Sequence, residues 1–162
     1  MSFYDPLGLF VFFTSKIKLI YHWVCKDKSE WDEQLSTNQM KHWSKVLKWL
    51  PEILKLEIPR SYMNKVCINP NDTLIYQLII MGDAGKESLC TVAYIRIKNM
   101  TTSQVGTQFI ASKNFIVPIR QKRTIPELEL DIACKSVKFK EKLIKAHSIK
   151  FDTIVFITDS SC

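Results

Sequence analysis

The sequence predicts a mixed α/β (α+β) fold in which helices precede a β-sheet. Three observations predict it. All four tryptophans lie before residue 50, in a stretch whose apolar residues recur at helical spacing. Three apolar, strand-like runs follow, and a helical pattern separates them from one last strand-like run. This order favours a sheet that the last strand joins through a right-handed crossover helix.

The first predicted domain, residues 1–67, is helical. Ser36 is a suitable N-cap, and Pro51 is expected to close the helix that starts there. One apolar stripe of this helix is expected to face the core, and it consists of Met40, Trp43, Leu47 and Leu50. The apolar run at residues 7–13 is shorter than the roughly 18 residues of a membrane helix, so no membrane partner is expected.

The five cysteines are an odd number and contain no C-x-x-C spacing. This pattern indicates neither a zinc site nor a disulfide framework. It favours a reducing, intracellular location for the protein, in the cytoplasm or the nucleus.

The second predicted domain, residues 68–162, contains the sheet. Strands are expected at 73–81, 90–98 and 105–112, with turns at 83–87 and 99–103. The first of these runs is almost entirely apolar, as is typical of a strand buried on both faces.

A helix and one more strand complete this domain. Thr124 and Glu127 resemble a capping box with proline in the first turn. One face of the helix is expected to be buried, through Leu128, Ile132, Phe139 and Leu143. The last strand is expected at 153–158.

Three carboxylates are predicted at one edge of the sheet. Asp83 and Asp159 each follow an apolar strand, and Glu129 is placed in the first turn of the connecting helix. If the two strands are parallel neighbours, their carboxyl ends meet where open α/β sheets bind ligands. Clustered carboxylates suit Mg²⁺ or Mn²⁺ and metal-assisted displacement at phosphorus. Ordinary turn and helix N-terminal residues give the same spacing, so the pattern alone leaves both interpretations open.

The positive charge is concentrated in one segment. The chain has 23 Lys and Arg against 16 Asp and Glu, and residues 113–150 hold ten of the former and four of the latter. Contacts with nucleic-acid phosphates and a merely solvated helix face explain this charge about equally well. The candidate contacts are Lys113, Arg120, Lys122, Arg123, Lys135, Lys138 and Lys142.

A series of short motifs runs through the chain in a fixed order. They are Tyr4-Asp5-Pro6-Leu7-Gly8-Leu9, Glu30-Trp31-Asp32-Glu33, the tryptophan-rich helix 43–51, Glu57-Ile58-Pro59-Arg60, Gly82-Asp83-Ala84, Ala111-Ser112-Lys113 with Val117-Pro118, the segment 124–130, and Ile157-Thr158-Asp159-Ser160. In order and spacing they resemble motifs of BEL/Pao-type LTR retrotransposon polyproteins, among them Y/F-D-P-L-G-L/F, T-I-P-R-L-E-L and W-T-D-S. Glu127 replaces the arginine of the second of these.

The resemblance implies a helical connector that follows the reverse-transcriptase core and a ribonuclease H-like domain from residue 68. It implies that Asp83, Glu129 and Asp159 are catalytic, Mg²⁺- or Mn²⁺-binding members of a D-E-D-D set that hydrolyses RNA in RNA/DNA hybrids. The implied partners are the hybrid or another nucleic acid and the reverse-transcriptase domain. The chain ends before the fourth carboxylate, so we expect a truncated sheet, an incomplete site and no activity of the chain alone.

Two alternatives remain open. One is a non-catalytic, transposon-derived remnant or basic nucleic-acid-binding module. The other is an aspartic peptidase, because this family segment is often labelled a retrotransposon peptidase. Peptidase chemistry needs a D-T/S-G loop. The nearest strings, Asp83-Ala84-Gly85 and Asp159-Ser160-Ser161, do not fit that loop, which makes the peptidase the weaker alternative.

Overall fold

The computed structural model describes residues 4–28, 30, 32–59, 61–63, 66, 69–120 and 122–159. The predicted domain boundary at 67/68 and the motif residues Trp31, Arg60 and Ser160 lie outside this part. The described elements are α1 (Val11–Lys26), α2 (Thr37–Ile53), β1 (Leu74–Ala84), β2 (Ser88–Asn99), β3 (Val105–Ile116), α3 (Ile125–Ala146) and β4 (Thr153–Ile157). None of the described helices is both long and apolar enough to cross a bilayer.

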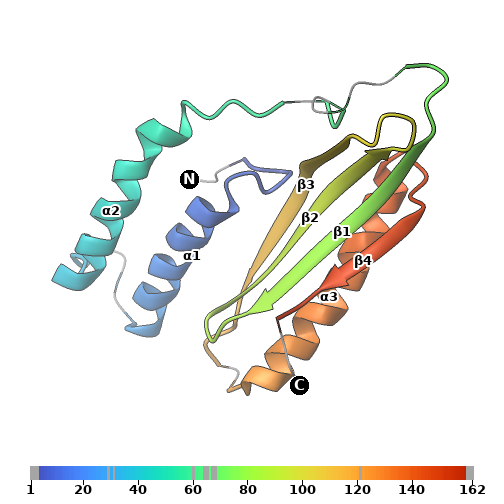
Figure 1. The fold of residues 1–162 in the computed structure, drawn as a ribbon. Coiled ribbons are helices and arrows are strands. Elements are labelled where there is room, and N and C mark those ends of the chain that lie inside the picture. Colours follow the sequence, from blue (N-terminus) through green and yellow to red (C-terminus); the bar gives the residue numbers. More distant parts are fainter. Residues whose placement is uncertain are drawn as a thin grey trace.

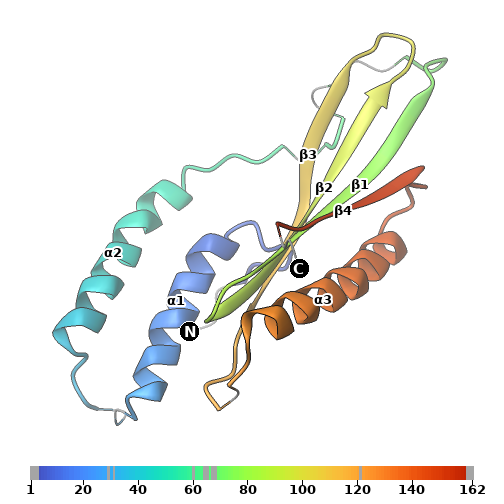
Figure 2. The ribbon, with the colours of Figure 1, turned by 60° about the horizontal axis from the view of Figure 1, so that its bottom comes forward.

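The strands form one mixed sheet in the order β3-β2-β1-β4. Neighbours β1, β2 and β3 are antiparallel, whereas β4 lies parallel to β1. Figures 1 and 2 show α3 along one face of this sheet, between β3 and β4 in the chain. The predicted α+β class and crossover helix are therefore confirmed. The first strand is longer than predicted, because β1 continues through Asp83 to Ala84.

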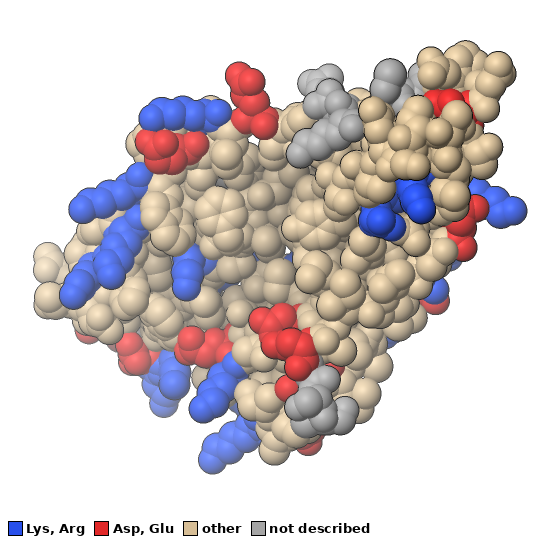
Figure 3. Space-filling view, viewed as in Figure 1, with Lys and Arg blue, Asp and Glu red and all other residues tan. Residues whose placement is uncertain are grey.

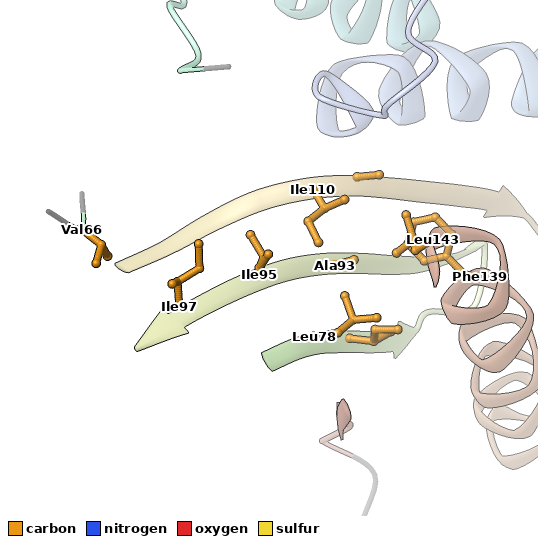
Figure 4. Packing of buried hydrophobic residues seen from close by; sticks show 10 residues of the cluster. Val66, Leu78, Ala93, Ile95, Ile97, Ile110, Phe139 and Leu143 are labelled. Atoms are coloured by element: carbon orange, nitrogen blue, oxygen red, sulfur yellow. The ribbon is translucent and has the colours of Figure 1, made fainter. Parts of the chain in front are cut away.

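The main core lies between α3 and the face of the sheet that it covers. Figure 4 shows Leu78 of β1, Ala93 and Ile95 of β2, and Phe139 and Leu143 of α3 converging there. All four residues predicted for the buried face of α3 are buried. Its N-terminus has the predicted capping box, in which Glu127 accepts a 2.7 Å hydrogen bond from the Thr124 backbone N–H.

One expectation for β1 was wrong. Leu78 and Ile80 have no exposed surface, but Met81, on the other face, is 40% exposed. The apolar run indicated burial on both faces, yet α3 covers one face only. The strand β4 is exposed along all five of its residues.

The first part of the chain is a helical hairpin, α1 and α2, that lies beside β3 (Figure 1). Its core contains Phe13, Ile20, Val46 and Ile53. The Ser36 capping box is confirmed. The predicted core stripe was wrong, since its members Met40, Leu47 and Leu50 are 38–49% exposed and only Trp43 packs against this core. Pro51 does not close α2, which ends two residues later.

The carboxylate edge and the basic helix

The carboxyl ends of β1 and β4 and the N-terminus of α3 lie at the same end of the sheet (Figures 1 and 2). The last paired residues of the two strands are Met81 and Ile157. Asp83 and Asp159 each stand two residues further on, so the parallel register brings them level at this edge. Glu129 is the fifth residue of α3, in its second turn and not in its first as expected.

The two faces of the sheet separate the candidate carboxylates. A Cβ on Gly82 would lie 2.9 Å from Oγ of Ser136 on α3, so position 82 faces that helix. Successive strand residues point to opposite faces, which places Asp83 on the face away from α3. There it neighbours Cys90, whose pKa is raised first by burial and then by the Asp83 charge. Glu129 belongs to the helix on the other face.

The carboxylate oxygens at this edge are suitable ligands for a divalent metal. Asp83 and Asp159 are exposed oxygen donors, and Mg²⁺ is commonly held by one or two carboxylates together with substrate phosphates. Within the described part of the chain, no three His, Cys, Asp or Glu side chains gather in a group that could hold one ion. The structure thus brings Asp83 and Asp159 to one edge without a closed three-ligand site, and the roles of all three carboxylates stay predictions.

The seven candidate basic residues divide into two groups. Lys135 and Arg123 both form ion pairs with Asp131. The ammonium groups of Lys113 and Lys135 lie 5.6 and 5.4 Å from the ring centroids of Phe139 and Phe115. The others are exposed and make no ion pair with another described residue: Arg120, Lys122, Lys138 and Lys142. These four are the cations free to contact a polyanion.

The free energy of unfolding is expected to fall in acid, because Asp131 becomes protonated there. Its pKa is lowered first by the hydrogen bond from Lys135 and further by Arg123, although burial opposes this. A carboxylate whose pKa is lowered by folding stabilises the fold above its unfolded pKa, about 4, and loses that contribution as the pH falls through the folded value. Urea denaturation should find Asp131→Asn about 0.5–1 kcal/mol less stable than the parent at neutral pH. The difference should shrink and vanish as the pH falls through the lowered pKa of Asp131. The exposed loop variant Asp32→Asn should match the parent throughout, and an Asp131 difference that persisted in acid would contradict the ion-pair explanation.

The N-terminal motif has a structural function that the sequence did not reveal. Asp5 accepts hydrogen bonds from the backbone N–H groups of Leu9 and Phe10, at 2.9 and 2.8 Å, where α1 begins. Gly8 has φ of +71°, and its carbonyl accepts a 2.6 Å hydrogen bond from the Ser112 hydroxyl of β3. The backbone N–H of Ser112 also donates to the Leu7 carbonyl. The motif therefore attaches the hairpin to the sheet, and its Asp-Pro and Gly turn residues were the available signal.

A family model described as Pao retrotransposon-like RNaseH-like domain matches residues 1–160. A solved structure described as the foamy viral protease-reverse transcriptase dRH in complex with ds DNA is similar at 16% identity and a TM-score of 0.45. The match covers 96% of this chain and 31% of that one, so the chain spans about a third of that protein. No curated protein matches the sequence. Since the family model extends over nearly the whole sequence, the chain belongs to the Pao retrotransposon-like RNaseH-like domain family.

Proposed function

We propose that this domain, as part of its parent polyprotein, hydrolyses RNA in RNA/DNA hybrids, with Mg²⁺ or Mn²⁺ held by Asp83 and Asp159 and with Glu129 as the third carboxylate. One observation carries the proposal: the parallel register of β1 and β4 brings Asp83 and Asp159 level at the end of the sheet where α3 begins. The reverse-transcriptase domain of the parent polyprotein is the proposed neighbour of the helical hairpin.

Different residues of the chain would bind the metal and the nucleic acid. Asp83 and Asp159 would hold the metal. A bound metal would activate water and stabilise the leaving oxygen at phosphorus. Exposed cations before and along α3, among them Lys122 and Lys138, would attract phosphates irrespective of sequence. Recognition of the hybrid would depend on backbone shape and 2′-hydroxyl groups, which needs no base-reading motif.

The test is cleavage of an end-labelled RNA/DNA hybrid in Mg²⁺, in Mn²⁺ and in EDTA. Asp83→Asn is expected to abolish metal-dependent cleavage, because it removes a carboxylate from the proposed ligands. Glu141→Gln is the matched control, since this exposed residue of α3 lies far along the helix from the carboxylate edge. Cleavage that survives in EDTA, or that Asp83→Asn leaves intact, would rule out the proposed chemistry. Absence of cleavage in both metals favours the second candidate below.

The second candidate is a nucleic-acid-binding module without catalysis. It is favoured by the exposed cations Lys138 and Lys142 and by the lack of a three-ligand group among the described residues. Each phosphate contact contributes about 0.9 to the slope of log affinity against log salt. The double variant Lys138→Gln, Lys142→Gln should therefore lower this slope for a hybrid by about 2 in fluorescence anisotropy titrations.

Lys55→Gln is the control for this binding experiment, because Lys55 lies just after the end of α2, is exposed and forms an ion pair with Glu52 of that helix. It should leave the salt slope unchanged. Equal effects of the control and the double variant would indicate that only net charge matters, and would remove α3 as the binding face.

A further inference from the structure

The two helices of the hairpin are strongly basic. Together α1 and α2 contain six lysines against one acidic residue, Glu52, and that residue forms a 2.8 Å ion pair with Lys55. Figure 3 shows lysine side chains spaced along α2, the helix of the hairpin that lies further from the sheet. The other acidic residues before residue 60 lie outside both helices: Asp5, Asp27, Glu30, Asp32, Glu33 and Glu57.

Three lysines lie along one side of α2. Lys41, Lys45 and Lys48 recur at steps of four and three residues, which places them on the same side of a helix. All three are exposed, and none forms an ion pair with a described residue. Met40 and Leu47 lie on a different side of α2, so they stay available for the proposed reverse-transcriptase neighbour.

Two aromatic rings lie beside these lysines. The rings of Phe12 on α1 and Trp49 on α2 contact each other, with 6.2 Å between their centroids. Phe12 is 50% exposed and Trp49 is 40% exposed, so both rings keep surface that faces solvent. Trp49 is four residues after Lys45, which makes the two side chains neighbours along α2.

A lysine of α1 lies on the same side of the hairpin. Lys16 is four residues after Phe12, is exposed and forms no ion pair with a described residue. The two helices run in opposite directions (Figure 1). One helical turn from the contact between Phe12 and Trp49 therefore leads to Lys16 on α1 and to Lys45 on α2. These two lysines flank the aromatic pair from both helices.

Exposed lysines with aromatic rings between them suit a single-stranded nucleic acid. Proteins that bind single strands contact the phosphates with cations and stack the unpaired bases on aromatic side chains. A helix that binds a membrane surface needs a broad apolar face, whereas here four lysines surround two rings. Two carboxylates border this surface, and both have partners. Glu52 pairs with Lys55, and Glu87 accepts a 2.8 Å hydrogen bond from the Trp23 indole.

We infer that this side of the hairpin binds single-stranded nucleic acid irrespective of its sequence. Its residues, called the hairpin face, are Phe12, Lys16, Lys41, Lys45, Lys48 and Trp49. Bases would stack on the two rings, and phosphates would contact the four lysines. The hairpin lies beside β3, whereas the carboxylate edge lies at the ends of β1 and β4. The hairpin face is therefore separate from the proposed catalytic site, and its binding does not depend on hydrolysis.

The experiment measures fluorescence anisotropy of a labelled oligothymidine of about 12 nucleotides as the full chain is added, in EDTA. Trp49→Ala should weaken the affinity about tenfold, because one stacked base is lost. Trp49→Phe keeps a ring and should stay within about twofold of the parent. Trp49→Ala should not change the affinity for the same strand paired with oligodeoxyadenosine, because paired bases are not free to stack. Far-ultraviolet circular dichroism checks that both variants keep their helices.

The contribution of the lysines is measured by the salt dependence of binding. Each phosphate contact of a single strand contributes about 0.7 to the slope of log affinity against log salt. The double variant Lys41→Gln, Lys45→Gln should therefore lower the slope for oligothymidine by about 1.4. The matched control is Lys18→Gln, Lys150→Gln, which removes the same charge from two exposed lysines that form no ion pair with a described residue. Both lie outside the hairpin face, so the slope should not change.

The inference fails if Trp49→Ala binds oligothymidine as tightly as the parent does. It also fails if the two double variants lower the salt slope equally, because net charge alone would then explain the binding. A third contrary result is that Trp49→Ala weakens binding to phosphatidylserine vesicles but not to oligothymidine, which would assign the hairpin face to a membrane. Failure of hybrid cleavage would leave the inference intact, because no cleavage step enters these measurements.

Discussion

Replacing Phe139 by alanine is expected to lower the free energy of unfolding by about 3–5 kcal/mol. The ring is 4% exposed and lies in the core between α3 and the sheet, with Leu78 and Leu143 in the same cluster (Figure 4). Truncation loses the transfer free energy of the ring and leaves a cavity, because neighbouring strands cannot collapse freely. It also removes the surface over which the Lys113 ammonium lies.

Urea denaturation followed by far-ultraviolet circular dichroism measures this change. Val137→Ala on the same helix is the control, because Val137 is 43% exposed and its truncation should cost under about 0.5 kcal/mol. Since all tryptophans belong to the first 50 residues, their fluorescence reports on the hairpin separately. Coincident transitions by both signals would show that hairpin and sheet unfold together. A loss below about 1 kcal/mol in Phe139→Ala would contradict the central role of this core.

The sequence predicted the buried face of α3 but not that of α2, and the difference has a physical reason. On α3, the buried apolar residues recur at steps of four and seven, whereas the exposed apolar residues Leu130, Val137 and Ile144 recur only every seven residues, so the helical spacing favours the buried stripe. On α2, apolar residues occur on both sides of the helix: Val46 and Ile53 face α1, while Met40 and Leu47 are exposed. Spacing cannot decide between two apolar stripes when the neighbouring helix is unknown.

The carboxylate edge was predictable in part for a similar reason. The crossover pattern was sufficient to predict that Asp83 and Asp159 follow neighbouring parallel strands. The face on which Asp83 lies depends on the strand continuing to Ala84, whereas the sequence had indicated a turn from Asp83. How the hairpin meets β3 could not be predicted, because this tertiary contact has no local sequence pattern.

Replacing Gly8 by alanine is expected to detach the N-terminal loop from the sheet and to destabilise the attached hairpin by about 3 kcal/mol. Alanine at a φ of +71° costs about 1–2 kcal/mol, because the left-handed region crowds Cβ against the backbone. The new Cβ would also overlap the Ser112 backbone oxygen and lie 2.7 Å from its Oγ. Because β3 is held in the sheet, the loop has to move away from it. The two hydrogen bonds between the loop and Ser112, worth about 1 kcal/mol each, are then lost.

Hydrogen exchange of the α1 amides and tryptophan fluorescence during urea denaturation should both report this loss. Gly85→Ala is the control, since the backbone of Gly85 needs no left-handed conformation and its new Cβ would meet only the Ser88 carbonyl, at 3.3 Å. The sheet should keep its circular dichroism in Gly8→Ala, because the main core does not include the loop. Unchanged exchange in α1 would contradict this prediction. It would mean that the contacts between the Gly8 loop and β3 can be lost without weakening the hairpin.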